Sequence, residues 1–265
     1  MPTPIELVFN PVSYTVFGIY AALMLWEAVA PARRLPKMAG WQARGLAAFV
    51  VYFFLSSYLP FAWLETLAQW QLFDLTGLGT AAGALVGLLV YEAGVYVWHR
   101  AMHGSTALWR AFHQMHHSAE RIDTYGAFWF SPLDMIGWTA LSSLCLTLIV
   151  GISAEAAVIV LYVTTFFSVF QHANIRTPRW LGYIVQRPES HSYHHERGVH
   201  ARNYSDLPIF DILLGTFYNP AGFAPAAGFY EGASARLGAM LAMRDVSKPR
   251  TQRQVGISTG ARVAG

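Results

Sequence analysis

Charge and cysteine are both scarce in this chain. Asp, Glu, Lys and Arg make up 12% of its 265 residues, about half of their usual share in a soluble domain. The formal net charge of +3 is too small to indicate a nucleic-acid partner. The one cysteine, Cys145, lies in an apolar run and excludes both an intramolecular disulfide and a cysteine-based metal cluster. This composition is that of a membrane protein.

Several motifs of soluble enzymes are also missing. No Gly-x-Gly-x-x-Gly follows a strand pattern, so the sequence does not predict a nicotinamide or flavin site. No His-Glu-x-x-His or Glu-x-x-His occurs, which argues against a zinc protease and a soluble di-iron bundle. The start, MPTPIELVF, lacks the basic segment of a signal peptide, and no domain like cytochrome b5 precedes the first apolar stretch, so we expect neither.

What the chain does have is long apolar stretches, with 54% hydrophobic residues overall. A helix needs about 20 apolar residues to cross a bilayer. Five stretches come close to that length, at roughly 11–31, 45–64, 77–98, 133–151 and 154–171. The last two are separated by a very short turn and form a hairpin. The sequence therefore predicts an all-α, polytopic membrane bundle of about five spans.

The basic residues predict how this bundle is oriented. The segment between the first two stretches carries four basic residues and no acid, whereas 65–76 carries Glu65 and Asp74 and no base. With five spans, all 18 Lys and Arg fall on one side of the membrane or at its edge. Positive charge marks the cytoplasmic side. We therefore expect a multi-pass protein of a bacterial inner membrane or the endoplasmic reticulum, with its N-terminus on the other side.

Three regions follow from this pattern. Residues 1–76 hold the N-terminal spans, and 77–220 form a core that contains every histidine. Residues 221–265 form a cytosolic segment, and its polar tail from about 244 (RDVSKPRTQRQ) is expected to be disordered.

Ten histidines lie in the middle of the chain, and none occurs in the first 98 or the last 65 residues. Three clusters, HRAMH, HQMHH and HSYHH, contribute eight of them, and His172 and His200 are separate. Spacings of three and four place side chains on one face of a helix. The topology also brings all clusters to the cytosolic side, as a helical cap. Nine converging imidazoles, the eight clustered ones and His172, are enough to hold two metal ions.

Acidic side chains near such a site could orient the ligands and offset the metal charge. Glu92 is the best candidate, because it lies two helical turns before His99 and is the only clear acid inside a span near the clusters. The alternative is that Glu92 pairs with an arginine. Further candidates, each of which could instead be a solvated loop charge, are Asp123, Glu189, Glu196 and Asp211.

Two polar residues outside the clusters have open roles. His200 could be a tenth ligand, a base that faces the substrate, or a loop histidine without metal. Asn174 follows His172 by two residues and could bind a ligand or a metal-bound water, or could cap a helix end.

At this point the motifs identify a family. The chain resembles the fatty acid hydroxylase superfamily, also called the sterol desaturase family, over about residues 90–220. The resemblance rests on YVWHRAMHGSTALWRAFHQMHHSAE, QHANI and HSYHHERGVHARNYSDLPIFDILLGTFYNP. It implies a helical membrane fold with a cytosolic cap and a di-iron centre that uses O2 to hydroxylate or desaturate a lipid or sterol-like substrate.

The resemblance also implies a ligand set and a partner. The implied metal ligands are His99, His103, His113, His116, His117, His172, His191, His194 and His195. Some relatives have another histidine four residues after the counterpart of His172, where this chain has Arg176, so Asn174, a water or His200 could complete the shell. Electrons would come from a separate reductase, ferredoxin or cytochrome b5-like donor.

Three other interpretations remain open from the sequence. A member of the same superfamily could cleave an ether lipid after hydroxylating it. A protein of another class could carry haem and electrons, although paired haem ligands belong within spans rather than at their ends. A metal carrier would need His, Asp or Met inside several spans.

Overall fold

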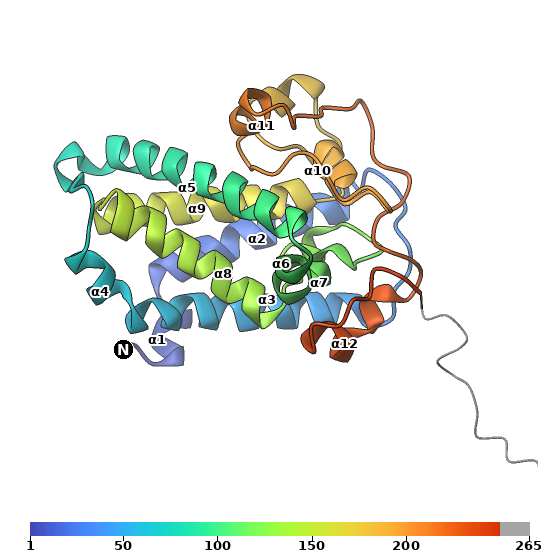
Figure 1. Cartoon of the computed structure of the whole chain (residues 1–265), viewed down its shortest axis with the longest axis horizontal. Coiled ribbons are helices and arrows are strands. Elements are labelled where there is room, and N and C mark those ends of the chain that lie inside the picture. The colour runs from blue at the N-terminus through green and yellow to red at the C-terminus, as the bar shows by residue number, and fades with distance from the viewer. Residues whose placement is uncertain (250–265) are drawn as a thin grey trace, which may run out of the picture.

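A computed structural model describes residues 1–249. Over these residues the protein is a helical bundle, and pairing between extended segments is limited to one isolated bridge between Glu196 and Ala227. Long helices run side by side along the longest axis of the molecule, and most of the short helices and loops gather at one end of them (Figure 1). This confirms the predicted all-α fold.

Among the described residues, five helices are long and apolar enough to cross a membrane. They are α2 (Pro11–Val29), α3 (Trp41–Tyr58, continued by η1, Leu59–Ala62), α5 (Gly79–Gly104), α8 (Pro132–Ser143, continued by the π-helical η5, Leu144–Ile149) and α9 (Ala154–His172). The predicted five-span count is confirmed. The last two spans form the expected hairpin, because only residues 150–153 separate η5 from α9.

Polar caps decide where three of these helices begin. The side chain of Asn10 accepts a hydrogen bond from the Val12 amide, and Pro11 supplies the first residue of α2. Ser131 caps α8 in the same way, again with a proline in the first position, and Ser153 caps α9. An apolar helix in a membrane has few other partners for its first amide groups, so these caps mark the span boundaries.

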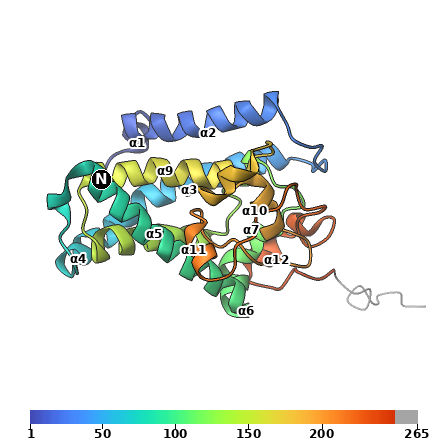
Figure 2. The ribbon, with the colours of Figure 1, turned by 90° about the horizontal axis from the view of Figure 1, so that it is seen from above.

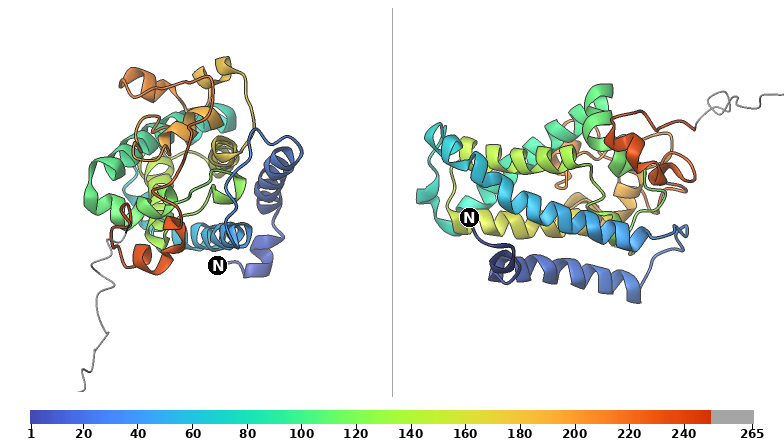
Figure 3. Two further views of the ribbon diagram at one scale, coloured as in Figure 1. Left: turned by 90° about the vertical axis from the view of Figure 1, so that its right-hand side faces the viewer. Right: turned by 90° about the horizontal axis from the view of Figure 1, so that it is seen from below.

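Glycines allow α5 to pack closely against the hairpin. A Cβ at Gly87 would lie 2.7 Å from the Ile152 side chain, and one at Gly94 would lie 2.8 Å from the Cys145 sulfur. The single cysteine is therefore a buried packing residue, as predicted. Helix α2 packs on α9 and forms an outer layer along the bundle (Figures 2 and 3).

Short elements complete the structure. One end of the bundle, where the N-terminus lies, carries α1 (Pro4–Val8), α4 (Leu64–Gln69) and η2 (Thr76–Leu78). The other end carries α6 (Thr106–Leu108), η3 (Trp109–His113), α7 (Gln114–His117), η4 (Thr124–Gly126), η6 (Arg179–Tyr183), α10 (Pro188–His194), α11 (Ile209–Leu213), η7 (Ala233–Ala235) and α12 (Leu237–Leu241). Seen from this end, these elements and their loops lie in front of part of the bundle, while α2 and α3 are seen end-on beside them (Figure 3, left). We call this end of the molecule the cap.

The polar stretch from 244 packs on the cap as far as the structure describes it. The Val246 side chain is fully buried, and its amide donates to the Gln114 side chain, which in turn donates to the Arg244 carbonyl. Residues 250–265 of the tail lie outside the described residues.

Candidate metal centre

The nine histidines of the implied ligand set meet at the cap end of the bundle, in two groups. The larger, the five-histidine group, consists of His99, His103, His113, His117 and His194. The smaller, the four-histidine group, consists of His116, His172, His191 and His195. Within each group, one nitrogen of every ring lies within 4.8 Å of those of the others. The sequence clusters are thus divided between two sites.

Helix periodicity accounts for much of this division. In each cluster the two histidines four residues apart belong to the same group, as His113 and His117 do. His116 lies between these two in the sequence. It is about 100° around the helix from His117 and faces the other group. His194 differs in the same way from His191 and His195. The side-chain face, rather than membership of a cluster, selects the group.

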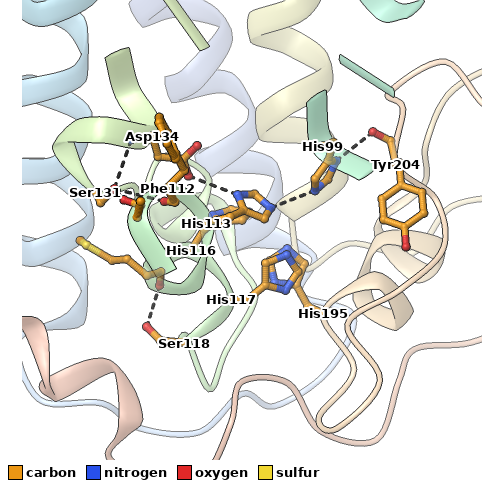
Figure 4. Close-up of polar contacts among 12 residues, drawn as sticks. His99, Phe112, His113, His116, His117, Ser118, Ser131, Asp134, His195 and Tyr204 are labelled. Carbon is orange, nitrogen blue, oxygen red and sulfur yellow. Dashed lines mark hydrogen bonds and ion pairs between the residues drawn. The ribbon is translucent and has the colours of Figure 1, made fainter. Parts of the chain in front are cut away.

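The Nε2 atoms of the rings face one another. In the five-histidine group, Nε2 of His113 lies 2.9 Å from that of His99. Figure 4 marks this contact with a dashed line. Nε2 of His172 lies 3.1 Å from that of His116 and 3.0 Å from that of His191. Two imidazole nitrogens that bind one ion at about 2.1 Å and at a right angle are about 3.0 Å apart. The spacing is that of ligands around a common ion.

The hydrogen bonds on the other side of the rings indicate a cation. His99 Nδ1 lies 2.8 Å from the Tyr204 carbonyl oxygen, which can only accept, so this nitrogen carries the ring proton. His113 Nδ1 lies 3.2 Å from a carboxylate oxygen of Asp134. In the neutral rings both Nε2 atoms then present lone pairs to each other, and a metal ion between them would remove the repulsion. The buried Nε2 of His103, which has no hydrogen-bond partner among the described residues, fits the same role.

All five rings of the five-histidine group are held at their outer nitrogen. His103 Nδ1 donates to the His200 carbonyl at 2.8 Å, and His194 Nδ1 donates to the Arg202 carbonyl at 2.7 Å. His117 Nδ1 lies 3.1 Å from Nδ1 of His200. Together with the Tyr204 carbonyl and Asp134, these contacts fix the orientation and the tautomer of each ring.

The four-histidine group has less of this support. His172 Nδ1 donates to the Ser168 carbonyl at 2.6 Å, one turn back along α9. Over residues 1–249, the buried Nδ1 atoms of His116, His191 and His195 have no hydrogen-bond partner. The His116 ring lies near the backbone of Trp129, and this backbone partly offsets the lowering of the His116 pKa. The two groups do not form a hydrogen bond.

The two groups are in direct contact within an aromatic shell. The rings of His117 and His195, one from each group, stack with centroids 4.1 Å apart (Figure 4). Phe130 lies against His116, Trp138 against His99, and Trp109 against His117. An apolar shell of this kind limits the access of water to a metal site.

Burial keeps the cap histidines neutral. The pKa values of His113, His116, His117, His191, His194 and His195 all lie well below 6.5, chiefly because the charged ring would lose its hydration. Neighbouring imidazoles lower these pKa values further. Neutral imidazole is the form that binds a metal ion, so the rings are ready to bind at neutral pH.

Glu92 acts on the site through a loop. Its buried carboxylate accepts the amides of Asp206 and Leu207, at 3.0 and 3.1 Å, and the Ser205 hydroxyl at 3.1 Å. The Tyr204 carbonyl, which holds His99, directly precedes this segment. Glu92 therefore anchors the loop rather than a ring, and within residues 1–249 none of its hydrogen bonds is to an arginine.

The structure also shows an acid that the sequence interpretation missed. Asp134 lies inside a span, is fully buried and contacts His113 directly, so Glu92 is not the only intramembrane acid near the clusters. The sequence did offer a signal for it, because Asp134 stands in the first turn of the fourth span, shortly after HQMHH. Asp211 accepts the amides of Tyr204 and Ser205 and so supports the same loop as Glu92.

The other candidate acids stabilise loops. Asp123 accepts from the Trp41 indole, and Glu189 pairs with Arg187 at 3.0 Å and accepts from Thr177. Glu196 is half-buried and belongs to the bridge with Ala227.

His200 and Asn174 lie outside both groups. His200 contacts two rings of the five-histidine group from behind, one through its side chain and one through its carbonyl. The Asn174 amide group donates to the Arg33 carbonyl, and its backbone NH donates to Glu27, so this residue fastens the loop after α2. The Arg176 side chain, at the position where some relatives have another histidine, is exposed. The four-histidine group therefore gains no fifth ring from this position.

A pocket of about 340 Å³ reaches the five-histidine group from the cap surface. Its lining includes His103, Trp109, His200 and Asp245.

Comparison with known proteins gives a consistent result. The fatty acid hydroxylase family model matches residues 84–216. The ornithine lipid hydroxylase OlsE of Rhizobium tropici is 34% identical over 141 residues, which are 51% of this chain and 42% of that protein. The sphingolipid C4-hydroxylase sur2 of Schizosaccharomyces pombe is 25% identical over 51% of this chain and 48% of its own length.

A third relative carries a different activity in its name. The very-long-chain aldehyde decarbonylase GL1-9 of Oryza sativa subsp. indica is 26% identical over 50% of this chain and 53% of that protein. The chain spans about half the length of these curated relatives, and no solved structure matches it. Since the family model covers half of the residues and includes all ten histidines, the chain belongs to the fatty acid hydroxylase family.

Proposed function

We propose that this protein is an O2-dependent di-iron hydroxylase that oxidises a C–H bond of a membrane lipid. The observation that carries the proposal is the convergence of nine neutral imidazoles, in two groups, at one end of a bundle of membrane-spanning helices. The named lipid hydroxylases among the relatives support the reaction and the substrate class.

The donor sets suit iron with open coordination positions. Five and four nitrogen ligands leave at least one and two positions of a six-coordinate ion for other ligands. Imidazole is a common ligand of non-haem iron. When bound, the iron supplies the binding and reduction of O2 that oxidation of an unactivated C–H bond requires.

The protein's own residues prepare the site for this chemistry. Asp134 and the carbonyls of Tyr204, His200 and Arg202 hold the rings of the five-histidine group in one orientation. The aromatic shell keeps water away. Electrons must reach the site from a separate donor, which we place on the basic, cytoplasmic face with the cap.

Lipid analysis tests the reaction. A deletion strain is compared with the same strain carrying the wild-type gene or the His194→Ala variant. We expect a lipid with one additional oxygen only in the wild-type strain. A loss of two hydrogens would show desaturation instead, and loss of an ether lipid would show cleavage. Identical lipids in all strains would contradict the proposal.

A visible spectrum of the purified protein tests the haem alternative. A haem carrier shows an intense Soret band, whereas the proposed histidine-rich iron site does not. Cysteine labelling from both sides of the membrane, with Cys145 removed, tests the orientation. A label near residue 36 that reacts only from the periplasmic or lumenal side would reverse it.

A further inference from the structure

Two short cap elements, η6 and α11, expose large apolar side chains outside the five spans. Trp180, Tyr183 and Ile184 at η6 are 63%, 59% and 60% exposed. Ile212, Leu213 and Leu214 at α11 are 45%, 72% and 53% exposed. The ring of Tyr183 lies 5.5 Å from that of Phe217, just after α11, which joins the two elements. We call these six side chains the apolar patch of the cap.

Helix α11 buries its acidic side chain and exposes its apolar ones, which is the reverse of a surface helix in water. Its acid, Asp211, is 1% exposed and points into the protein, where it accepts from Thr216 and from two backbone amides. Its isoleucine and leucine side chains point outward. A helix that faces water buries its apolar side instead. This arrangement fits a helix whose outer face contacts lipid.

The position of α11 along the bundle agrees with this interpretation. Glu92 accepts the amides that lead into α11 and lies seven residues before His99, which is about 10 Å along α5 toward the middle of the span. The Tyr96 hydroxyl contacts Thr216 at 3.2 Å. Helix α11 lies beside the half of α5 that leads to the cap (Figures 1 and 2). The apolar patch therefore continues the lipid-facing surface of α5, where Val97 is 67% exposed.

Arginines adjoin the same elements. Arg100 donates to the Tyr96 hydroxyl, Arg179 donates to the Asn219 carbonyl, and Arg202 lies over the Tyr218 ring. All three arginine residues are exposed. The segments 176–184 and 204–217 contain only two acids, and both are engaged, Asp206 with Gln171 and Asp211 as described. An apolar surface next to exposed arginines matches the acyl region and the anionic headgroups of one leaflet.

We propose that η6 and α11 form an interfacial membrane-binding surface, which inserts its apolar patch into the leaflet at the cap end and binds anionic phospholipid headgroups through Arg100, Arg179 and Arg202. The inference rests on the spanning fold and not on the proposed reaction. It assigns a second kind of lipid contact to the protein, distinct from the substrate.

Insertion is tested with a fluorophore on single cysteines, with Cys145 replaced by Ala, in bilayer nanodiscs. Labels at Leu213 and Trp180 are compared with Val97 on the span and with Val199, an apolar residue 43% exposed beside the polar pocket. Lipids with a nitroxide in the upper acyl chain should quench the labels at 213, 180 and 97 several-fold more than the label at 199. Quenching at 213 and 180 that matches 199, with access to aqueous iodide, would overturn insertion.

Headgroup binding is tested in the same nanodiscs with nitroxides on phosphatidylglycerol or phosphatidylcholine headgroups. For the Leu213 label, phosphatidylglycerol should quench more strongly. Replacing the three arginines by Gln should reduce this preference about fivefold or more, since each basic residue near the surface contributes. Arg244→Gln, a change of an exposed cap arginine outside these elements, should preserve it. Equal quenching by both headgroups, or an equal effect of Arg244→Gln, would contradict the anionic preference.

Discussion

The two histidine groups offer the same kind of ligand, but the protein holds them differently. Each ring of the five-histidine group has a partner at its outer nitrogen, from Asp134, His200 or a backbone carbonyl. In the four-histidine group, as far as residues 1–249 are concerned, His172 alone has one. Removal of such partners typically costs about 10–100-fold in metal affinity. We therefore expect the five-histidine group to bind its ion more tightly and the four-histidine group to exchange it more readily.

The largest effect should come from removing one ligand of either group. His194→Ala and His191→Ala form a matched pair, because both residues lie on α10 and their rings stack 5.2 Å apart. Both variants should lose activity by about 10³-fold or more, since ligands act as a unit. Elemental analysis should find that each variant keeps about one iron.

The remaining iron distinguishes the two groups. It should resist a chelator in His191→Ala, where the five-histidine group is intact, and leave quickly in His194→Ala. Equal rates of iron loss from the two variants would contradict the claim that the hydrogen bonds to the five-histidine group make it bind iron more tightly.

A smaller effect is expected from Asp134→Asn, which keeps the shape but replaces the carboxyl group beside His113 by an amide. Metal affinity at the five-histidine group should fall about 10–100-fold, and the four-histidine group should be unaffected. Competition with a chelator of known affinity measures both. Asp123→Asn is the control, since Asp123 is also buried but binds Trp41 and Arg121 rather than a histidine. A similar loss in both variants would mean that Asp134 acts on folding alone.

Acid should release metal from both groups and weaken the fold. Burial lowers the pKa values of the cap histidines, and that of His200 to about 4, whereas an unfolded histidine has a pKa of about 6.5. The unfolded chain thus binds more protons below pH about 6.5, so stability is complete above that pH and declines as the pH falls toward 4. Metal content and melting temperature measured over this range should fall together. A melting temperature that rises on acidification would contradict the neutral, buried rings.

The smallest effect should come from His200→Asn. The variant loses the contact with His117 and the ring packing on Trp109 and Phe229. It keeps the contact with His103, which uses the backbone carbonyl. His200 has a φ of +44°, a conformation that Asn tolerates better than most residues. We expect both irons to be retained and activity to fall by less than about tenfold. Loss of a whole iron from this variant would make His200 a ligand.

The sequence predicted the convergence of the histidines because helix spacing and the one-sided charge pattern are both local features. The division into five and four depends on short helices whose direction is set by tertiary packing. Even so, each i, i+4 pair, such as His99 and His103, stays within one group. That regularity could have been read from the spacing.

The partners of single polar residues were harder to predict. Glu92 lies on the His99 face, as expected, but its partners are more than a hundred positions later in the chain, at Ser205 to Leu207. Asn174 lies close to His172 in sequence, yet its side chain turns to the loop after α2. Sequence proximity does not determine the direction of a side chain where the backbone leaves a helix.

The most direct test is Mössbauer spectroscopy on protein enriched in the Mössbauer-active iron isotope, recorded before and during chelation. The proposed sites, one with five imidazoles and one with four, predict two irons per chain that give two doublets of equal area. The doublet of the weakly supported site should disappear first. One iron per chain, or two doublets that decline together at one rate, would contradict two unequal histidine sites.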